Sequence, residues 1–514
     1  MAGGYTCSSA QSAMTTAQQK FLPLPALLAI ISLALWFFLG FPWQLHNESL
    51  IWDISLRHAT IWDALFSNPV PTVQTYRPLG MLLAWLTFHL TGGGVWLQQL
   101  CNFIITAAAW ILALRATRNQ LHFAFLSFAC GAAYFSGYIY LFHLHGVFYG
   151  PLLGYLAYLL VEAQSKTSPT APQALQWFAV GTAFALFHPF ALLMLVGFIG
   201  AQCVQNLMDG QPPKIGLSML VVVGAVVEIK LLTQGSSDIL RGGPLPGLLA
   251  TYRALEFNRL LAVLSATLAI ATLASLSTVN SRRLMLAAVG IAAATALLFL
   301  RQPVVLAWIV ACLLASLYRR QMVLASLVAV CGLLPIATGT GTPTYAVFVI
   351  MPCIVVTVHE FQTRPQWHSI ATLLATVFIV VTALLWIVLR LEWQVPLITT
   401  LVKPLYAERE KTYQLENVFV WLDAHPQVVG NLRLCHPAEF PVLSGGAVDR
   451  ERRAPSDEWA FDKYLQSRYG QRFDQVSPAL VLCFGGEQRT HSEPLMSFPG
   501  KWAGVASIQQ LEVR

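Results

Sequence analysis

GMLLAWLTFHLTGGGVWLQQLCNFIITAAAWILALRATRN, residues 80–119, contains two apolar segments separated by the sequence TGGG. Its formally charged side chains, Arg115 and Arg118, both follow the second segment. That segment, 97–115, has the length of a membrane-spanning helix, since about 20 apolar helical residues cross the hydrocarbon core. The first segment, Leu79–Leu90, is too short to span comfortably and is predicted to lie as a helix on the outer membrane surface. An apolar helix followed by a basic connection is typical of a membrane-spanning chain.

The same pattern recurs along most of the sequence. The 514 residues are 56% hydrophobic and only 11% charged, with a mean hydropathy of +0.60. A soluble domain carries about 25% charged residues. We therefore expect an all-α polytopic membrane domain with about 13 transmembrane helices. The predicted helices lie near 21–41, 97–115, 121–140, 145–163, 174–189, 191–208, 215–233, 259–279, 284–300, 303–318, 322–338, 344–358 and 368–390.

Basic residues between these segments predict their orientation. An excess of Lys and Arg marks the cytoplasmic side of a membrane protein. Residues 1–20 lack the features of a removable signal peptide and are predicted to be a cytoplasmic tail. Residues 21–390 then form the membrane domain, and an odd number of spans places residues 391–514 outside. The basic residues that alternate onto the inner side are Arg115, Arg118, Lys166, Lys214, Arg282, Arg283, Arg319, Arg320 and Arg364.

The chain changes character after Arg390. Residues 391–514 hold 15 of the 24 acidic and 13 of the 31 basic side chains, and they are predicted to form a soluble α/β domain. Glu408–His425 has helical periodicity, and 431–435, 479–486 and 505–513 are predicted strands. Cys435 and Cys483 each end an apolar strand, so they can pair if the strands are neighbours in an oxidising compartment.

Carboxylates gather in the first outer loop, 42–96. Only nine acidic side chains remain in residues 1–390, and three of them are Glu48, Asp53 and Asp63. Charges near a membrane are costly unless they are solvated or functional. Asp53 and Asp63 suit two roles equally at this point, positioning a substrate or capping a surface helix. The loop also carries Arg57, Tyr76 and Arg77, which we count with Asp63 as candidate substrate-binding residues.

Several arginines fall on the outer side, against the usual bias. Arg241 and Arg253 flank Gly242 and Gly243 in a Gly/Pro-rich loop that suits a mobile lid over a ligand. Guanidinium groups bind phosphates through forked hydrogen bonds, so we expect an anionic ligand at the outer leaflet, although each arginine can instead snorkel to head groups. The formal charge of +7 is dispersed through loops, which argues against a nucleic-acid partner.

Two histidines follow at the next outer turn. His143 and His145, in LFHLHGVFYG, are candidate substrate-binding residues, and a polar loop in the head-group region is the alternative. They lack a third ligand at a defined spacing, so they make no metal site alone. His188, in FHPF, is a weaker case of the same kind. No cofactor is indicated with certainty, and a divalent metal stays open.

These features together resemble the GT-C superfamily of membrane glycosyltransferases. An acidic residue soon after the first helix, a long outer loop and TYRPLG at 75–80 are similar to its O-mannosyltransferase-like branch. About thirteen helices with an outer C-terminal domain are similar to bacterial lipid A aminoarabinose transferases. Many members carry Asp-Asp or Asp-Glu after the first helix, whereas this chain has Asn47-Glu48. The resemblance therefore implies that either Glu48 or Asp53 is the catalytic carboxylate.

The resemblance also implies a reaction and a place. A GT-C enzyme of the bacterial inner membrane transfers a sugar from a polyprenyl-phosphate donor to a protein, lipid A or glycan acceptor at the periplasmic face. Arg77 is then expected to hold the donor phosphate or to organise the loop. Two rivals remain from the sequence. A polysaccharide or lipid transporter would more often show internal repeats and charged or broken helices at midplane. An O-antigen ligase or polymerase would carry its key groups in a large late loop.

Overall fold

The computed structural model of the chain describes a subset of its residues, on which every structural statement below rests. The described residues are 55–56, 59–67, 69, 76–90, 96–118, 146–164, 170–211, 215–232, 259–276, 304–337, 346–362, 414, 417–418, 420–426, 428, 432–434, 480–483, 494–500 and 504–510.

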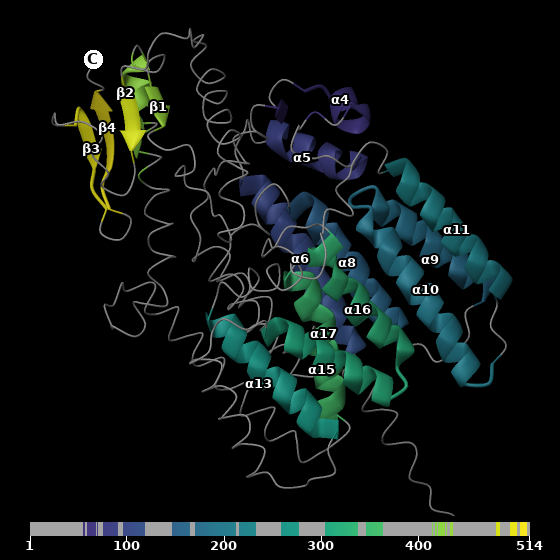
Figure 1. Cartoon of the computed structure of the whole chain (residues 1–514). Helices are drawn as coiled ribbons and strands as arrows, with labels where there is room; N and C mark the ends of the chain where they lie inside the picture. The colour runs from purple at the N-terminus through teal and green to yellow at the C-terminus, as the bar shows by residue number, and fades with distance from the viewer. Residues whose placement is uncertain are drawn as a thin grey trace, which may run out of the picture.

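This part of the chain is mostly helical (Figure 1). One helix, α10, is long and apolar enough at 19 residues to cross a membrane, and several shorter apolar helices accompany it. In chain order the helices are α4 (Ile61–Phe66), α5 (Pro78–Leu90), α6 (Trp96–Ala116), α8 (Gly146–Glu162), α9 (Ala171–Ala185), α10 (Phe190–Met208), α11 (Ile215–Leu232), α13 (Arg259–Leu276), α15 (Val304–Tyr318), α16 (Met322–Ala337) and α17 (Ala346–Gln362).

Nine of the thirteen predicted helical ranges fall on described residues, and each contains a helix. Two of these ranges differ most from the helices observed. The helix α9 begins at Ala171, three residues before the predicted start at 174. The range 174–189 extends too far, because α9 ends at Ala185. Pro189 disfavours helical backbone at the residue before it, which leaves His188 in the turn. The range 344–358 stops too early, because α17 continues to Gln362. The ranges 21–41, 121–140, 284–300 and 368–390 lie outside the described residues.

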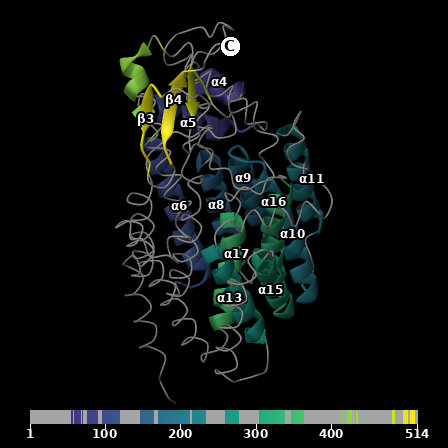
Figure 2. The ribbon, with the colours of Figure 1, turned by 60° about the vertical axis from the view of Figure 1, so that its left-hand side comes forward.

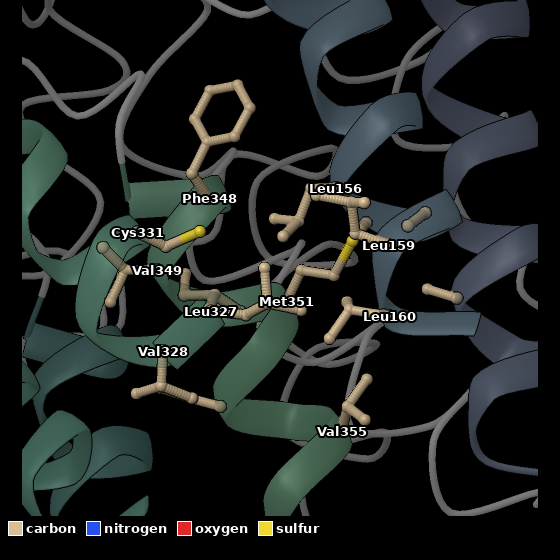
Figure 3. Packing of buried hydrophobic residues seen from close by; sticks show 14 of the residues in the cluster. Leu156, Leu159, Leu160, Leu327, Val328, Cys331, Phe348, Val349, Met351 and Val355 are labelled. Atoms are coloured by element: carbon tan, nitrogen blue, oxygen red, sulfur yellow. The ribbon is translucent and has the colours of Figure 1, made fainter. Parts of the chain in front are cut away.

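The hydrophobic core lies between helices that are far apart in the sequence. Leu156 and Leu160 of α8 face Met351 and Val355 of α17, with Leu327 of α16 beside them (Figure 3). All five side chains are 2% exposed or less. The core therefore joins α8 to α16 and α17, nearly two hundred residues later in the chain, as one packed unit.

Small residues let α10 and α16 approach closely. The Ser326 hydroxyl donates a 2.8 Å hydrogen bond to the carbonyl oxygen of Gly197. A Cβ added at Gly197 would lie only 2.7 Å from Cγ2 of Val330. In a lipid environment, close contacts between small residues of this kind stabilise the association of two helices.

The two ends of the bundle have different character. At the α5 end, which we define by Arg77, Tyr149 and His188, α4 and α5 lie across the ends of the longer helices (Figure 1). At the Arg319 end, the Arg319 guanidinium pairs with Glu360 at 3.0 Å, and the carboxylate is 2% exposed. Arg115, Arg118, Arg319 and Arg320 belong to this second end, because Gln362 of α17 donates to the carbonyl oxygen of Thr117 at 2.9 Å. Four of the nine basic residues predicted on the inner side therefore lie at one end of the bundle, and the other five lie outside the described residues.

The C-terminal region contains a four-stranded sheet of order β1-β2-β4-β3. β1 pairs with β2 in parallel, and β4 is antiparallel to both β2 and β3. The sheet lies at the same end of the molecule as α4 and α5 in both views (Figures 1 and 2). Its strands are β1 (Leu432–Leu434), β2 (Leu480–Cys483), β3 (Met496–Phe498) and β4 (Ala506–Gln510).

Three of these strands were predicted, and β3 was missed because MSF is short and has no β-branched run. Residues 417–418 and 420–424 are helical within the predicted range Glu408–His425. Cys483 is disulfide-bonded. The expected neighbour strands are confirmed, since Leu434 of β1 pairs with Leu482 of β2. Cys435 lies outside the described residues.

Candidate anion site at the α5 end

Three of the predicted site residues are described, and all three belong to the α5 end. Asp63 lies in α4, and Tyr76 and Arg77 precede α5. The other predicted residues lie outside the described part of the chain, so the structure does not place them relative to these three. They are Glu48, Asp53, Arg57, His143, His145, Arg241 and Arg253.

Asp63 forms the capping box of α4. Its Oδ2 accepts 2.7 Å hydrogen bonds from both the backbone N–H and the hydroxyl of Thr60, and the Asp63 N–H donates to Oγ1 of Thr60. These bonds favour the carboxylate and lower the pKa of Asp63 below its ordinary value. The capping role considered from the sequence is therefore present, and the substrate role of Asp63 stays a prediction.

Side chains of α5 and of Tyr76 hold the first loop in place. The Tyr76 hydroxyl donates to the carbonyl oxygen of Leu65 at 2.6 Å. The indole N–H of Trp85 donates to the carbonyl oxygen of Ala59 at 2.8 Å. Nε2 of His89 donates to the carbonyl oxygen of Leu56 at 3.1 Å. Polar side chains of a largely apolar helix thus fix the backbone on both sides of the predicted residue Arg57.

Arg77 is held at the first turn of α5. Pro78 starts the helix, where its fixed φ is already helical and its missing N–H costs nothing. The Leu79 N–H donates to the carbonyl oxygen of Leu186 at 3.2 Å, which ties this turn to the end of α9. The Arg77 side chain is half-buried. The backbone next to Arg77 is therefore fixed both by the start of α5 and by the hydrogen bond to the end of α9.

His188 lies in the turn between α9 and α10, beside Arg77. The imidazole is buried, with 6% of the residue exposed, and its Nδ1 accepts a 3.2 Å hydrogen bond from the Phe190 N–H. Its Nε2 has no hydrogen-bond partner among the described residues. Burial, and after it the charge of Arg77, hold the pKa of His188 well below its usual range, because both disfavour a second positive charge. Because Nδ1 accepts a hydrogen bond, it carries no proton, and the imidazole is neutral in this arrangement.

Aromatic side chains fix the imidazole from one side. The ring of Tyr149, from the first turn of α8, lies 5.3 Å from the His188 ring, centroid to centroid. Tyr149 in turn meets Phe348 of α17 edge-on, at 6.0 Å. α8 therefore contacts His188 through Tyr149, and α17 supports Tyr149 from its other neighbour, Phe348.

Sequence reasoning ranked His188 below His143 and His145, because all three were judged as members of polar loops. The available signal was the His188-Pro189 pair, which predicts a turn with a fixed backbone. What the sequence did not reveal is that this turn packs against the start of α5, more than one hundred residues earlier in the chain.

The described residues include no group of three or more His, Cys, Asp or Glu side chains that could hold a metal ion. The arrangement of Arg77 and His188 instead combines a cation with a neutral hydrogen-bond donor, which suits an anionic oxygen. Comparisons with protein-family models, with curated proteins and with solved structures found no match to this chain.

Proposed function

We propose that this protein is an integral membrane glycosyltransferase of the GT-C type. It transfers a sugar from a polyprenyl-phosphate donor to a protein, lipid A or glycan acceptor at the periplasmic face of a bacterial inner membrane. The proposal includes the full architecture expected from the sequence, with about 13 membrane-spanning helices and an outer α/β domain in residues 391–514.

The chemistry needs two kinds of group. The acceptor oxygen forms a bond to the anomeric carbon of the sugar while the bond from that carbon to the phosphate oxygen breaks. A carboxylate, Glu48 or Asp53, takes the acceptor's proton as general base, a role worth about 10²–10⁴ in rate. The leaving polyprenyl phosphate carries away the electron pair and is stabilised by positive charge.

The observation that carries the proposal is the placement of Arg77. Its half-buried side chain sits beside a buried neutral histidine, at the end of an apolar helical bundle opposite the Arg319 end. A cation held there meets a lipid phosphate at head-group depth, where the phosphate of a polyprenyl donor would lie. The sheet of the C-terminal region lies at that same end, where an acceptor would arrive (Figure 2).

The first experiment identifies the reaction. Mass spectrometry of lipid A, surface glycans and exported proteins is compared between wild type, a deletion strain and the deletion strain carrying Glu48→Gln. We expect one sugar modification to disappear in the deletion strain and to stay absent with Glu48→Gln. Unchanged glycosylation in the deletion strain would refute a glycosyltransferase. Full rescue by Glu48→Gln would instead assign the base to Asp53.

A further inference from the structure

His188 has one nitrogen in use and one without a partner. Nδ1 accepts from the Phe190 N–H, so in a neutral imidazole the single proton must be on Nε2. His188 Nε2 is therefore a buried N–H donor that no described group satisfies. Leaving a buried donor unpaired costs about 1–3 kcal/mol. Such a group points to an acceptor that the described residues do not supply.

The surroundings of Nε2 define the chemistry of that acceptor. The first turn of α5, which follows Arg77, contacts the α9–α10 turn through the 3.2 Å hydrogen bond from the Leu79 N–H to the Leu186 carbonyl oxygen, and the charge of Arg77 disfavours protonation of the imidazole. An acceptor next to both groups gains a charge-assisted bond from the guanidinium and a second bond from the imidazole N–H, which favours an anionic oxygen over a neutral one. The Tyr149 ring packs against the imidazole at a tilt of 38°, with the two ring centroids 5.3 Å apart.

We propose that His188 Nε2–H and the Arg77 guanidinium together bind the phosphate of a polyprenyl-phosphate lipid. This inference deepens the proposed function, on which it rests for the identity of the lipid. It makes His188 a substrate-binding residue that supplies a hydrogen bond, while Arg77 supplies the charge.

A structural role for His188 is also present and must be separated from binding. Its Nδ1 caps the first turn of α10, so any substitution can destabilise that helix. Substitution of His188 by Asn or by Gln separates the two roles. In His188→Asn the amide oxygen can take the place of Nδ1 and keep the cap, while the Nε2 donor is lost. In His188→Gln the amide N–H₂ can take the place of Nε2, while the cap is lost.

The test measures binding without turnover. Wild type and both variants are purified in nanodiscs and titrated with undecaprenyl phosphate and with undecaprenol as the uncharged control. We expect His188→Asn to weaken binding of the phosphate at least tenfold with little change in Tm. His188→Gln should stay within about threefold of wild type in affinity while its Tm falls. A tenfold loss corresponds to about 1.4 kcal/mol.

Two outcomes would overturn the inference. One is wild-type affinity for undecaprenyl phosphate in His188→Asn, and the other is equal affinity of the wild-type protein for undecaprenol. If His188→Asn does not fold, ¹⁵N-histidine spectra of the wild-type protein decide instead, since a bound phosphate must shift the Nε2–H resonance. Inorganic phosphate as a third probe separates recognition of a free anion from recognition of the lipid. The protein could also bind phosphate in a way that depends on His188 and yet show no transferase activity. That result would confirm the phosphate site and refute the proposed function.

Discussion

The guanidinium of Arg77, at the α5 end, is expected to determine the rate of sugar transfer. Arg77→Ala should lower kcat/KM with a purified lipid donor by about 10²–10³, corresponding to about 2.7–4 kcal/mol of barrier for the loss of one donor to a developing anion. Arg77→Lys should recover only part of this, because an ammonium cannot form two parallel bonds. Arg115→Ala at the Arg319 end is the matched control and should be near wild type, because that side chain is exposed. Near-normal activity of Arg77→Ala would move the phosphate site elsewhere on the outer face.

A second prediction for a single residue concerns Asp63, in the capping box of α4, and its dependence on pH. Hydrogen bonds lower the pKa of Asp63 in the folded protein, so they stabilise α4 above the ordinary carboxyl pKa and are lost as the pH falls through the folded value. Amide protection in α4, measured by hydrogen exchange, should be constant from neutral pH to pH 5 and fall in stronger acid. Asp63→Asn should reduce protection at neutral pH. Equal protection in Asp63→Asn at neutral pH would show that the box does not hold α4.

Helix packing gives a prediction at the scale of elements. Gly197→Ala forces a Cβ against Val330 in the contact between α10 and α16, and overpacking of this kind costs about 1–3 kcal/mol. Gly200→Ala, one turn away on the same helix, meets no atom within 4 Å and should be neutral or slightly stabilising. Thermal unfolding of both variants in the same detergent checks the difference. A Tm for Gly197→Ala equal to that of Gly200→Ala would contradict the close approach.

Elements were more predictable from the sequence than their ends and contacts. The helix 97–115 was found to within one residue at each end, because its apolar length and following arginines are local signals. The end of α17 was missed because Glu360 looks like a helix terminus, whereas Arg319 pairs with its charge from another helix. The contact between the start of α5, next to Arg77, and the turn that carries His188 was missed for the same reason. Contacts across long sequence separations leave no periodic trace, so only the three-dimensional packing reveals them.

The whole molecule is predicted to present its acidic loop and its C-terminal domain on the same side of the membrane. Reporters fused after Arg390 and at the C-terminus should both report the outer compartment. The disulfide at Cys483 supports this side, since disulfides persist in oxidising compartments. Alkylation of the unreduced protein should leave Cys483 unmodified, with Cys435, the residue that follows β1, as its expected partner. A cytoplasmic reporter signal would mean that one span has been miscounted.

The carboxylate of Glu360 has a mechanical consequence. It accepts from Arg319 and, at 3.1 Å, from the hydroxyl of Ser275, so one buried group fastens α13, α15 and α17 at the same end. Helices of this length are lever arms of about 25 Å at 1.5 Å per residue. Pivoting about the fastened end by about 5° would part their far ends by about 2 Å, by the same helical rise. In the proposed transferase, a bundle clamped at one end would open sideways at the other with little bending, and that motion would admit a lipid chain from the membrane plane.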